Sequence, residues 1–473
     1  PSPCVLNSNI TICSFTVGTK IIFSGSKQDY TLSVSNTGNI PLSDNAISIS
    51  VTPLTPSQSQ LLLAPASDYN CSLNVITSQA YCWGYNPNGE LGNGTTSNTG
   101  TPTLVAVGGN SAIPSGTKLI GVAAGTSQIG QGVTCAISSS GKLYCWGANS
   151  NGAVGDGTSG TNRLYPVAVA VGGNSDIPTN AVIKYVSTNN VTSCAVDSLG
   201  NGYCWGANYS GQFGNGTTTG SSYPKLITKG GDSAIPANAK LISVATSGQD
   251  VCVLDDAGNM YCSGSNSAGQ LGNGTTTSSS YPIMVTKGGS SAIPELAKIT
   301  QISLSKDNSS NEQSVCAVAD EEAYCWGYNN GVFGNGTTAN SNYPVAVSKG
   351  GSSAIPANGK FTVISTANQQ ACAIVESNAY CWGRNSRGQL GNGSTTSTLY
   401  PIAVATGNTG IPDGVSLLNI GTSFDNGISN GYSTCSLGSD DNFYCWGDNS
   451  YGELGQGTIN TPPYSTLPLK VLF

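Results

Sequence analysis

The chain has 473 residues, of which 9% are charged and 38% are hydrophobic, and its formal net charge is −7. It contains no basic run, which argues against nucleic-acid binding because that function needs clustered lysine and arginine. Its longest apolar runs are too short to span a bilayer. It contains no histidine, which excludes His-ligated zinc, c-type haem attachment and His-based catalytic triads.

The first 58 residues differ from the rest of the chain. Tyr30, Leu32 and Val34 alternate with polar residues, and so do the apolar residues of 47–51, a period typical of half-buried strands. We interpret residues 1–58 as a small immunoglobulin-like β domain. A domain with so few strands cannot close a sandwich and leaves the backbone of an edge strand unpaired. We therefore expect this edge to take part in assembly. The adjacent domain, a further module or a strand from another subunit could cover that edge.

From residue 59 to residue 473 one sequence unit occurs seven times. Its most recognisable part is YCWG-x-N followed by a glycine-rich GQLGNG. The second cysteine of each unit is separated from the next by 63, 59, 58, 63, 56 and 64 residues. A repeat of this size is the signature of a repeat protein, and seven units of one kind indicate one closed body.

Each unit contains four runs with strand character. In the fourth unit these are residues 240–245, 251–254, 259–262 and 281–286, and a linker of the type KGGSSAIP leads to the next unit. Four short antiparallel strands per unit are typical of a propeller blade. The sequence therefore predicts an all-β fold, a seven-bladed β-propeller with a small N-terminal Ig-like β domain.

The 16 cysteines form eight pairs at spacings of 9 to 11 residues, which do not fit C-x-x-C metal or redox motifs. In each repeat the two members flank a turn and lie on adjacent strands, where disulfides can form. Paired cysteines indicate an oxidising compartment, and a start at Pro1 instead of Met suggests a mature, secreted form. The predicted disulfides are Cys4 with Cys13, Cys71 with Cys82, Cys135 with Cys145, Cys194 with Cys204, Cys252 with Cys262, Cys316 with Cys325, Cys372 with Cys381 and Cys435 with Cys445.

The pattern C-A-V…G-x-x-Y-C-W-G-x-N-x-x-G-Q-L-G-x-G…Y-P-x-x-V resembles the repeat of the regulator of chromosome condensation family, over about residues 60–473. The resemblance implies a seven-bladed propeller. It implies no single function, because the family includes a nuclear nucleotide-exchange factor, a plant ultraviolet photoreceptor and a secreted β-lactamase inhibitor. The family's usual histidine before the second strand is replaced, for example by Thr192 or Asp250, and the motif tryptophan is Ser263 in the fourth unit. An extracellular chain would not meet a nuclear GTPase, so exchange activity is not expected.

Two residue classes invite functional interpretations. We expect the motif tryptophans to pack between blades, with carbohydrate stacking or light sensing as alternatives. The acidic groups at Asp255 and Asp256, at 320–322 and at Asp440 and Asp441 lie in turns, where turn formation is the simpler interpretation and calcium binding the alternative. We expect no metal, cofactor or catalytic residue. The tryptophans are Trp83, Trp146, Trp205, Trp326, Trp382 and Trp446.

Ten asparagines begin N-x-[ST] sequons and are candidate glycosylation sites. Five of them lie in GNG turns, where Asn and Gly supply positive φ, so turn geometry explains these five equally well. The ten are Asn9, Asn70, Asn93, Asn190, Asn208, Asn215, Asn273, Asn308, Asn335 and Asn392.

The loop between the first and second strands is long in unit two (126–132), unit five (306–313) and unit seven (422–431). Insertions in one type of loop lie on one face of a ring and indicate a binding face, with neutral drift as the alternative. We hypothesise a non-enzymatic extracellular structural or adhesive protein, a cell-surface or filament subunit. Its partners would be other copies of itself, another surface protein or glycans. The alternative is a secreted binding protein or enzyme inhibitor that acts through one face.

Overall fold

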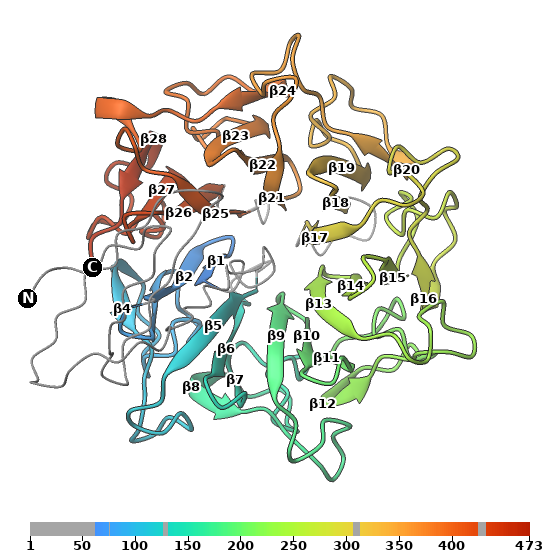
Figure 1. The fold of residues 1–473 in the computed structure, drawn as a ribbon. Coiled ribbons are helices and arrows are strands. Elements are labelled where there is room, and N and C mark those ends of the chain that lie inside the picture. Colours follow the sequence, from blue (N-terminus) through green and yellow to red (C-terminus); the bar gives the residue numbers. More distant parts are fainter. Residues whose placement is uncertain (1–61, 75, 126–130, 306–312, 424–431) are drawn as a thin grey trace, which may run out of the picture. The chain divides into compact units, whose positions relative to one another are not determined.

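The structure is a computed structural model that describes residues 62–74, 76–125, 131–305, 313–423 and 432–473. Residues 56–473 form one compact unit, whose described part is a ring of seven four-stranded antiparallel sheets (Figure 1). The predicted all-β, seven-bladed propeller is therefore confirmed. The predicted domain of residues 1–58 lies outside the described residues, and so do its predicted disulfide between Cys4 and Cys13 and the sequons at Asn9 and Asn308.

The four strands of each blade follow one another in sequence. Blade 1 contains β1 (Leu63–Pro65), β2 (Tyr69–Asn74), β3 (Gln79–Gly84) and β4 (Thr99–Leu104); blade 2 contains β5 (Leu119–Ala124), β6 (Val133–Ser138), β7 (Leu143–Gly147) and β8 (Arg163–Ala168). Blade 3 contains β9 (Ile183–Thr188), β10 (Thr192–Asp197), β11 (Gly202–Gly206) and β12 (Ser221–Leu226); blade 4 contains β13 (Leu241–Thr246), β14 (Asp250–Asp255), β15 (Met260–Gly264) and β16 (Ser279–Met284). Blade 5 contains β17 (Ile299–Leu304), β18 (Ser314–Ala319), β19 (Glu322–Gly327) and β20 (Ser341–Ala346); blade 6 contains β21 (Phe361–Thr366), β22 (Gln370–Val375), β23 (Asn378–Gly383) and β24 (Thr398–Ala403). Blade 7 contains β25 (Leu417–Thr422), β26 (Ser433–Gly438), β27 (Phe443–Asp448) and β28 (Tyr464–Lys470).

The first strand of each blade lies at the centre of the ring and the fourth lies at the rim (Figure 1). Burial follows this order. All six residues of β14 are buried, whereas β16 at the rim has only Pro282 buried. In the fourth unit the expected strands match the observed ones to within two residues at each end, and the last begins at Ser279 instead of Tyr281.

The ring closes without exchange of a strand between blades 1 and 7. Gly457 of blade 7 donates its backbone N–H to Gly100 O of blade 1 at 2.8 Å. The same bond, from the last glycine of the GNG turn to the fourth strand of the next blade, occurs at every other seam. These bonds are Gly94 to Leu164, Gly157 to Ser222, Gly216 to Ser280, Gly274 to Asn342, Gly336 to Leu399 and Gly393 to Thr466. The closing seam is therefore built like the other six.

Alternating strand directions give the ring two unlike faces. The connections from first to second and from third to fourth strand lie on one face, which we call the loop face. The turns from second to third strand and the linkers between blades lie on the other, the linker face. Each linker buries one isoleucine of its Ile-Pro pair. These residues, each at most 1% exposed, are Ile113, Ile177, Ile235, Ile293, Ile355 and Ile411.

Candidate functional site

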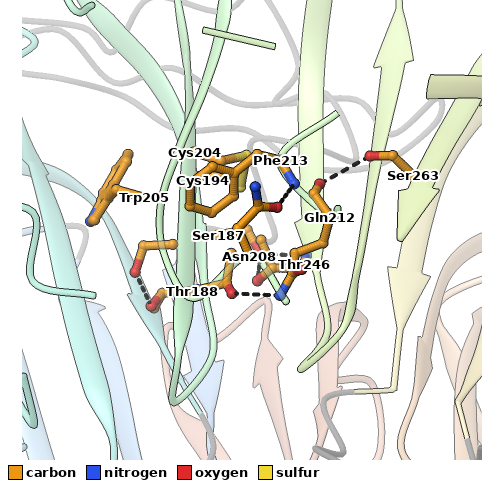
Figure 2. The surroundings of a disulfide bond; sticks show 12 residues. Ser187, Thr188, Cys194, Cys204, Trp205, Asn208, Gln212, Phe213, Thr246 and Ser263 are labelled. Atoms are coloured by element: carbon orange, nitrogen blue, oxygen red, sulfur yellow. Dashed lines mark hydrogen bonds between the residues drawn. A yellow bond between two sulfur atoms is a disulfide. The ribbon is translucent and has the colours of Figure 1, made fainter. Parts of the chain in front are cut away.

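Every blade carries a disulfide between its second and third strands. In blade 3, Cys194 and Cys204 lie directly opposite each other in the strand register, with Cα atoms 4.1 Å apart. Figure 2 shows this bond with Trp205 and Phe213 nearby. All seven predicted pairs of the propeller are joined in this way, and their cysteines are fully buried, so the bonds lie out of reach of solvent and serve the fold. The other six join Cys71 with Cys82, Cys135 with Cys145, Cys252 with Cys262, Cys316 with Cys325, Cys372 with Cys381 and Cys435 with Cys445.

The six motif tryptophans are fully buried, one at each of six seams. Each donates its indole N–H to a backbone carbonyl in the glycine-rich loop of the preceding blade; Trp205, for example, donates to Ala153 O at 2.8 Å. The predicted packing between blades is thus confirmed, and the hydrogen bond is an addition that the sequence did not reveal. Because the rings are buried and separate, they offer no stacking platform for a carbohydrate. The other bonds are Trp83 to Glu453, Trp146 to Glu90, Trp326 to Gln270, Trp382 to Val332 and Trp446 to Gln389.

Ser263 preserves this bond where the tryptophan is missing. Its hydroxyl donates to Gln212 O at 2.9 Å (Figure 2). In four blades the residue opposite the tryptophan supplies a second donor to the same carbonyl, as Ser193 does to Ala153 O. Asn70, Thr134 and Thr434 are the equivalent donors.

The structure divides the candidate glycosylation sites into two groups. Asn70 and Asn208 are fully buried and Asn190 is 4% exposed, so these three cannot carry a glycan in the folded chain. Asn208 explains why. It is the asparagine of the YCWG-x-N motif, and its side chain bonds Phe213 N and Thr217 O to shape the glycine-rich loop. The five in GNG turns are half-buried, and each side-chain oxygen accepts bonds from the Ser or Thr two residues on. These five are Asn93, Asn215, Asn273, Asn335 and Asn392.

The acidic groups of the linker face take part in turns. Asp255 accepts bonds from Asn259 N and from the Tyr261 hydroxyl, and Asp440 accepts one from the Tyr444 hydroxyl. Asp320 and Glu321 adopt positive φ in the tight turn of blade 5. Among the residues that the structure describes, no group of three or more Asp, Glu, Cys or His side chains is placed to hold a metal ion.

Sequence reasoning missed a set of buried carboxyl groups on the loop face. Glu90 and Glu453 are at most 1% exposed, and Asp250 is 1% exposed. Burial raises the pKa of Glu90 to about 7, despite hydrogen bonds that favour the charged form. Burial, and then the charges of Asp448 and Asp68, raise the pKa of Glu453. Burial also raises the pKa of Asp250. The signal was visible in the sequence, because units one and seven read GELG where units four and six read GQLG and the other three also have a neutral residue at this position.

The innermost strands surround a central channel with a volume of about 110 Å³. Aliphatic residues and small hydroxyl side chains line it together with Tyr185 and Asn419, and no lining residue is charged. Hydroxyl groups join neighbouring blades here: the Ser187 and Thr246 hydroxyls lie 3.1 Å apart, and those of Ser365 and Thr422 lie 3.0 Å apart. This uncharged lining can hold water or a small neutral group.

Charge is divided between the two faces. All lysines of the described residues lie at or next to the linker face, whereas the carboxyl groups that the structure describes on the loop face are buried or, at Asp156, paired with Arg163. Exposed groups on the loop face are mainly amides, hydroxyls and aromatic rings, such as Tyr209, which is 76% exposed. Arg384 lies over the Tyr432 ring at 4.8 Å on the same face. The lysines are Lys118, Lys142, Lys184, Lys225, Lys229, Lys240, Lys287, Lys298, Lys349, Lys360 and Lys470.

The long loops of units two, five and seven all belong to the loop face, because each joins a first strand to a second. Their central residues, 126–130, 306–312 and 424–431, lie outside the described residues. The hypothesis that they form a binding site stays a prediction.

The family model for the regulator of chromosome condensation (RCC1) repeat matches residues 78–129, 257–309 and 376–413, and a second RCC1-repeat model matches residues 129–153. These segments fall in blades 1, 2, 4, 5 and 6 of the ring. The propeller therefore contains RCC1 repeats in these segments.

Curated relatives of this RCC1-repeat propeller include the ultraviolet-B receptor UVR8 of Arabidopsis thaliana. That relative is 24% identical over 337 residues, which are 71% of this chain and 67% of the receptor. The human E3 ubiquitin-protein ligase HERC2 is 25% identical over 386 residues, which are 80% of this chain but 7% of the ligase. The chain therefore matches only a small part of that enzyme.

Solved structures support the fold. Human WBSCR16 superposes with a TM-score of 0.64 at 18% identity, covering 84% of this chain and 95% of that one. Yeast RCC1 (Prp20), solved with Kap60 bound, gives a TM-score of 0.64 at 15% identity, covering 93% and 91%. Because both identities are below 20%, these two superpositions show a shared fold and nothing about function. No helix in the described part of the chain is long and apolar enough to cross a membrane.

Proposed function

We propose that this protein is an extracellular structural or adhesive protein that presents a rigid propeller to other proteins, and that it is not an enzyme. The observation that carries the proposal is the buried disulfide repeated in all seven blades. Structural disulfides persist in oxidising compartments and are rare where thiols are kept reduced. A chain that relies on one in every blade is suited to surroundings outside the cytosol.

Protein binding is the activity that its relatives support. The yeast RCC1 structure holds Kap60, and another yeast Prp20p structure is described together with binding to Gsp1p and histones. We carry over only the general role of a propeller that binds proteins, because both chains are 15% identical to this one. The neutral lining of the central channel supports the non-enzymatic part of the proposal.

A second candidate is a secreted binding protein or inhibitor that acts through the loop face. The separation of charge favours it. Interface cores are depleted in lysine and exposed carboxylates and enriched in tyrosine and arginine, which matches the loop face and not the linker face. Tyr209 and Arg384 are the residues that we expect to contribute most to such an interface.

The deciding experiment is electron microscopy of the native material, combined with the mass of the purified protein in solution. Filaments or a surface layer with a propeller-sized repeat would support the structural role. A monomer that binds one soluble protein, and loses that binding in Tyr209→Ala, would favour the second candidate. Turnover of a glycan panel by the pure protein would contradict a non-enzymatic role.

Deletion of residues 1–58 tests how an assembly is held together. We expect a soluble, folded propeller that no longer assembles. If the shortened protein still forms the native assembly, residues 1–58 are not the connector.

A further inference from the structure

One position of the glycine-rich loop is a carboxylic acid in two blades and neutral in the other five. It is Glu90 in blade 1 and Glu453 in blade 7. Its backbone carbonyl accepts the Trp or Ser donor of the next blade, so the residue is part of every seam. The two seams with glutamate are the two that flank blade 1. The neutral residues are Ala153, Gln212, Gln270, Val332 and Gln389.

Glutamine and glutamate make the same bond within their own loop. Gln212 Oε1 accepts from Ser210 N at 3.0 Å, and Glu453 Oε2 accepts from Tyr451 N at 2.9 Å. They differ at the second side-chain atom. Gln212 Nε2 donates to Gly248 O of the next blade at 3.3 Å, whereas Glu453 Oε1 is buried without a hydrogen-bond partner. An ionised carboxylate cannot donate such a bond, and a protonated one can.

The groups around the two glutamates do not neutralise them. Asp448 and Tyr451 surround Glu453 on its own blade, and Asp68 faces it from blade 1. The rings of Tyr85 of blade 1 and Tyr451 are tilted against each other with centroids 4.5 Å apart, and Arg387 of blade 6 lies 3.8 Å from Asp448. Glu90 lies near Tyr69 and Tyr85 of its own blade. Its two carboxyl oxygens accept bonds from Asn88 N and Asn88 Nδ2, and Oε1 also accepts from Gly132 N of blade 2 at 3.4 Å. The only cation in this set therefore pairs with Asp448.

We propose that protonation of Glu90 and Glu453 locks blade 1 into the ring, so that acid closes the propeller firmly and alkali loosens it at blade 1. With its proton, each glutamate gains a donor like the one that Gln212 uses in blade 3, whereas the side-chain nitrogens of Gln270 and Gln389 are buried without a hydrogen-bond partner. The device is independent of the proposed function. It would suit a protein that works in acidic surroundings, and the absence of histidine removes the usual acid-sensitive side chain.

The direction of the pH effect follows from the raised pKa values. The folded chain holds protons that the unfolded chain has released, so the stabilisation is complete below about pH 4.5 and is lost as the pH rises through about 7. For Glu90 alone, a change of this size in pKa raises the unfolding equilibrium constant on the order of 10²-fold between those limits.

Denaturant unfolding between pH 4 and 9, with disulfides intact, tests the proposal on the full chain. We expect the wild-type midpoint to fall with rising pH. The double variant Glu90→Gln with Glu453→Gln should match the wild type at pH 4.5 and exceed it at pH 8. A wild-type midpoint that stays level or rises with pH would overturn the proposal, as would a double variant that declines like the wild type.

Hydrogen exchange, corrected for the intrinsic effect of pH, locates the change. Residues 63–104 should lose protection from pH 5 to pH 8 in the wild type and keep it in the double variant, with residues 299–346 of blade 5 as the internal reference. Gln212→Glu is the matched gain-of-function control, and it should create a new pH-sensitive seam between blades 3 and 4. Asp250→Asn should alter only blade 4. Equal protection of blades 1 and 5 at pH 8 would also overturn the proposal.

Discussion

Single side chains decide how each blade holds the next. The indole of Trp326 fills the seam with blade 4 and satisfies the carbonyl of Gln270. The adjacent glycine is required, because a Cβ on Gly272 would lie 2.5 Å from the Trp326 nitrogen. Ser263 shows that the hydrogen bond survives where the ring is absent. The packing of the tryptophan ring and the hydrogen bond to the carbonyl of the preceding blade therefore contribute separately to the stability of a seam.

This separation can be measured with two matched substitutions. Trp326→Phe removes the only N–H or O–H donor seen at Gln270 O among the described residues and should cost about 1–3 kcal/mol of unfolding free energy. Trp205→Phe should cost less, roughly 0.5–1.5 kcal/mol, because Ser193 still donates to Ala153 O. Denaturant unfolding of both variants gives the comparison. Equal losses would show that the carbonyl bond contributes nothing beyond the ring.

The hairpin of second and third strands is the stabilised element of each blade. Its cysteines are directly opposite in the register, as Cys252 and Cys262 are, and they are joined across a separation of only 9 to 11 residues. The strands around them are short. A local covalent link therefore supports an element that would be marginal alone.

Removal of one link should weaken the protein without abolishing its fold. We expect the double substitution Cys194→Ala with Cys204→Ala to lower the unfolding free energy by about 2.5–3 kcal/mol in the chain-entropy model for a loop of this size. Denaturation under non-reducing conditions measures the loss, and Cys252→Ala with Cys262→Ala is the matched control because its loop is equally long. Peptide mapping of a non-reduced digest should find no bridge between blades. Such a bridge would refute the pairing.

The ring as a whole is held by seven seams of one design. Blades 1 and 7 meet through Trp83 to Glu453 O and Gly457 to Gly100 O, the same bonds that join blades adjacent in sequence. Most propeller residues therefore contact neighbours in their own or the next blade, and position in the chain matters little to the ring.

A circular permutant tests this equivalence. A flexible linker would join Phe473 to Leu62, and new ends would open the linker between blades 3 and 4 at Gly230–Gly231. We expect a folded ring, because no strand would be divided or displaced. Its melting temperature should stay within several degrees of that of residues 62–473 alone. Failure of the permutant to fold would show that the seam between blades 7 and 1 is weaker than the others.

The sequence by itself determined the number of blades, the order of strands and the pairing of cysteines in the propeller. These features depend on local signals that recur about every 60 residues: a hairpin turn, two cysteines across it and a glycine-rich loop. Each signal is read within one unit, where neighbours in sequence are also neighbours in space. Because the same signals occur in all seven units, the interpretation of one unit supports the interpretation of the others.

Only the tertiary structure decided what each repeated residue does. Trp83 donates to a carbonyl 370 positions away, and Asn208 is buried although its sequon looks like that of Asn215. Glu90 occupies the same motif position as Gln212, and burial in the seam raises the pKa of its carboxyl group to about 7. Burial and partners come from the neighbouring blade, and the pattern within one unit carries no information about what the next blade places against it.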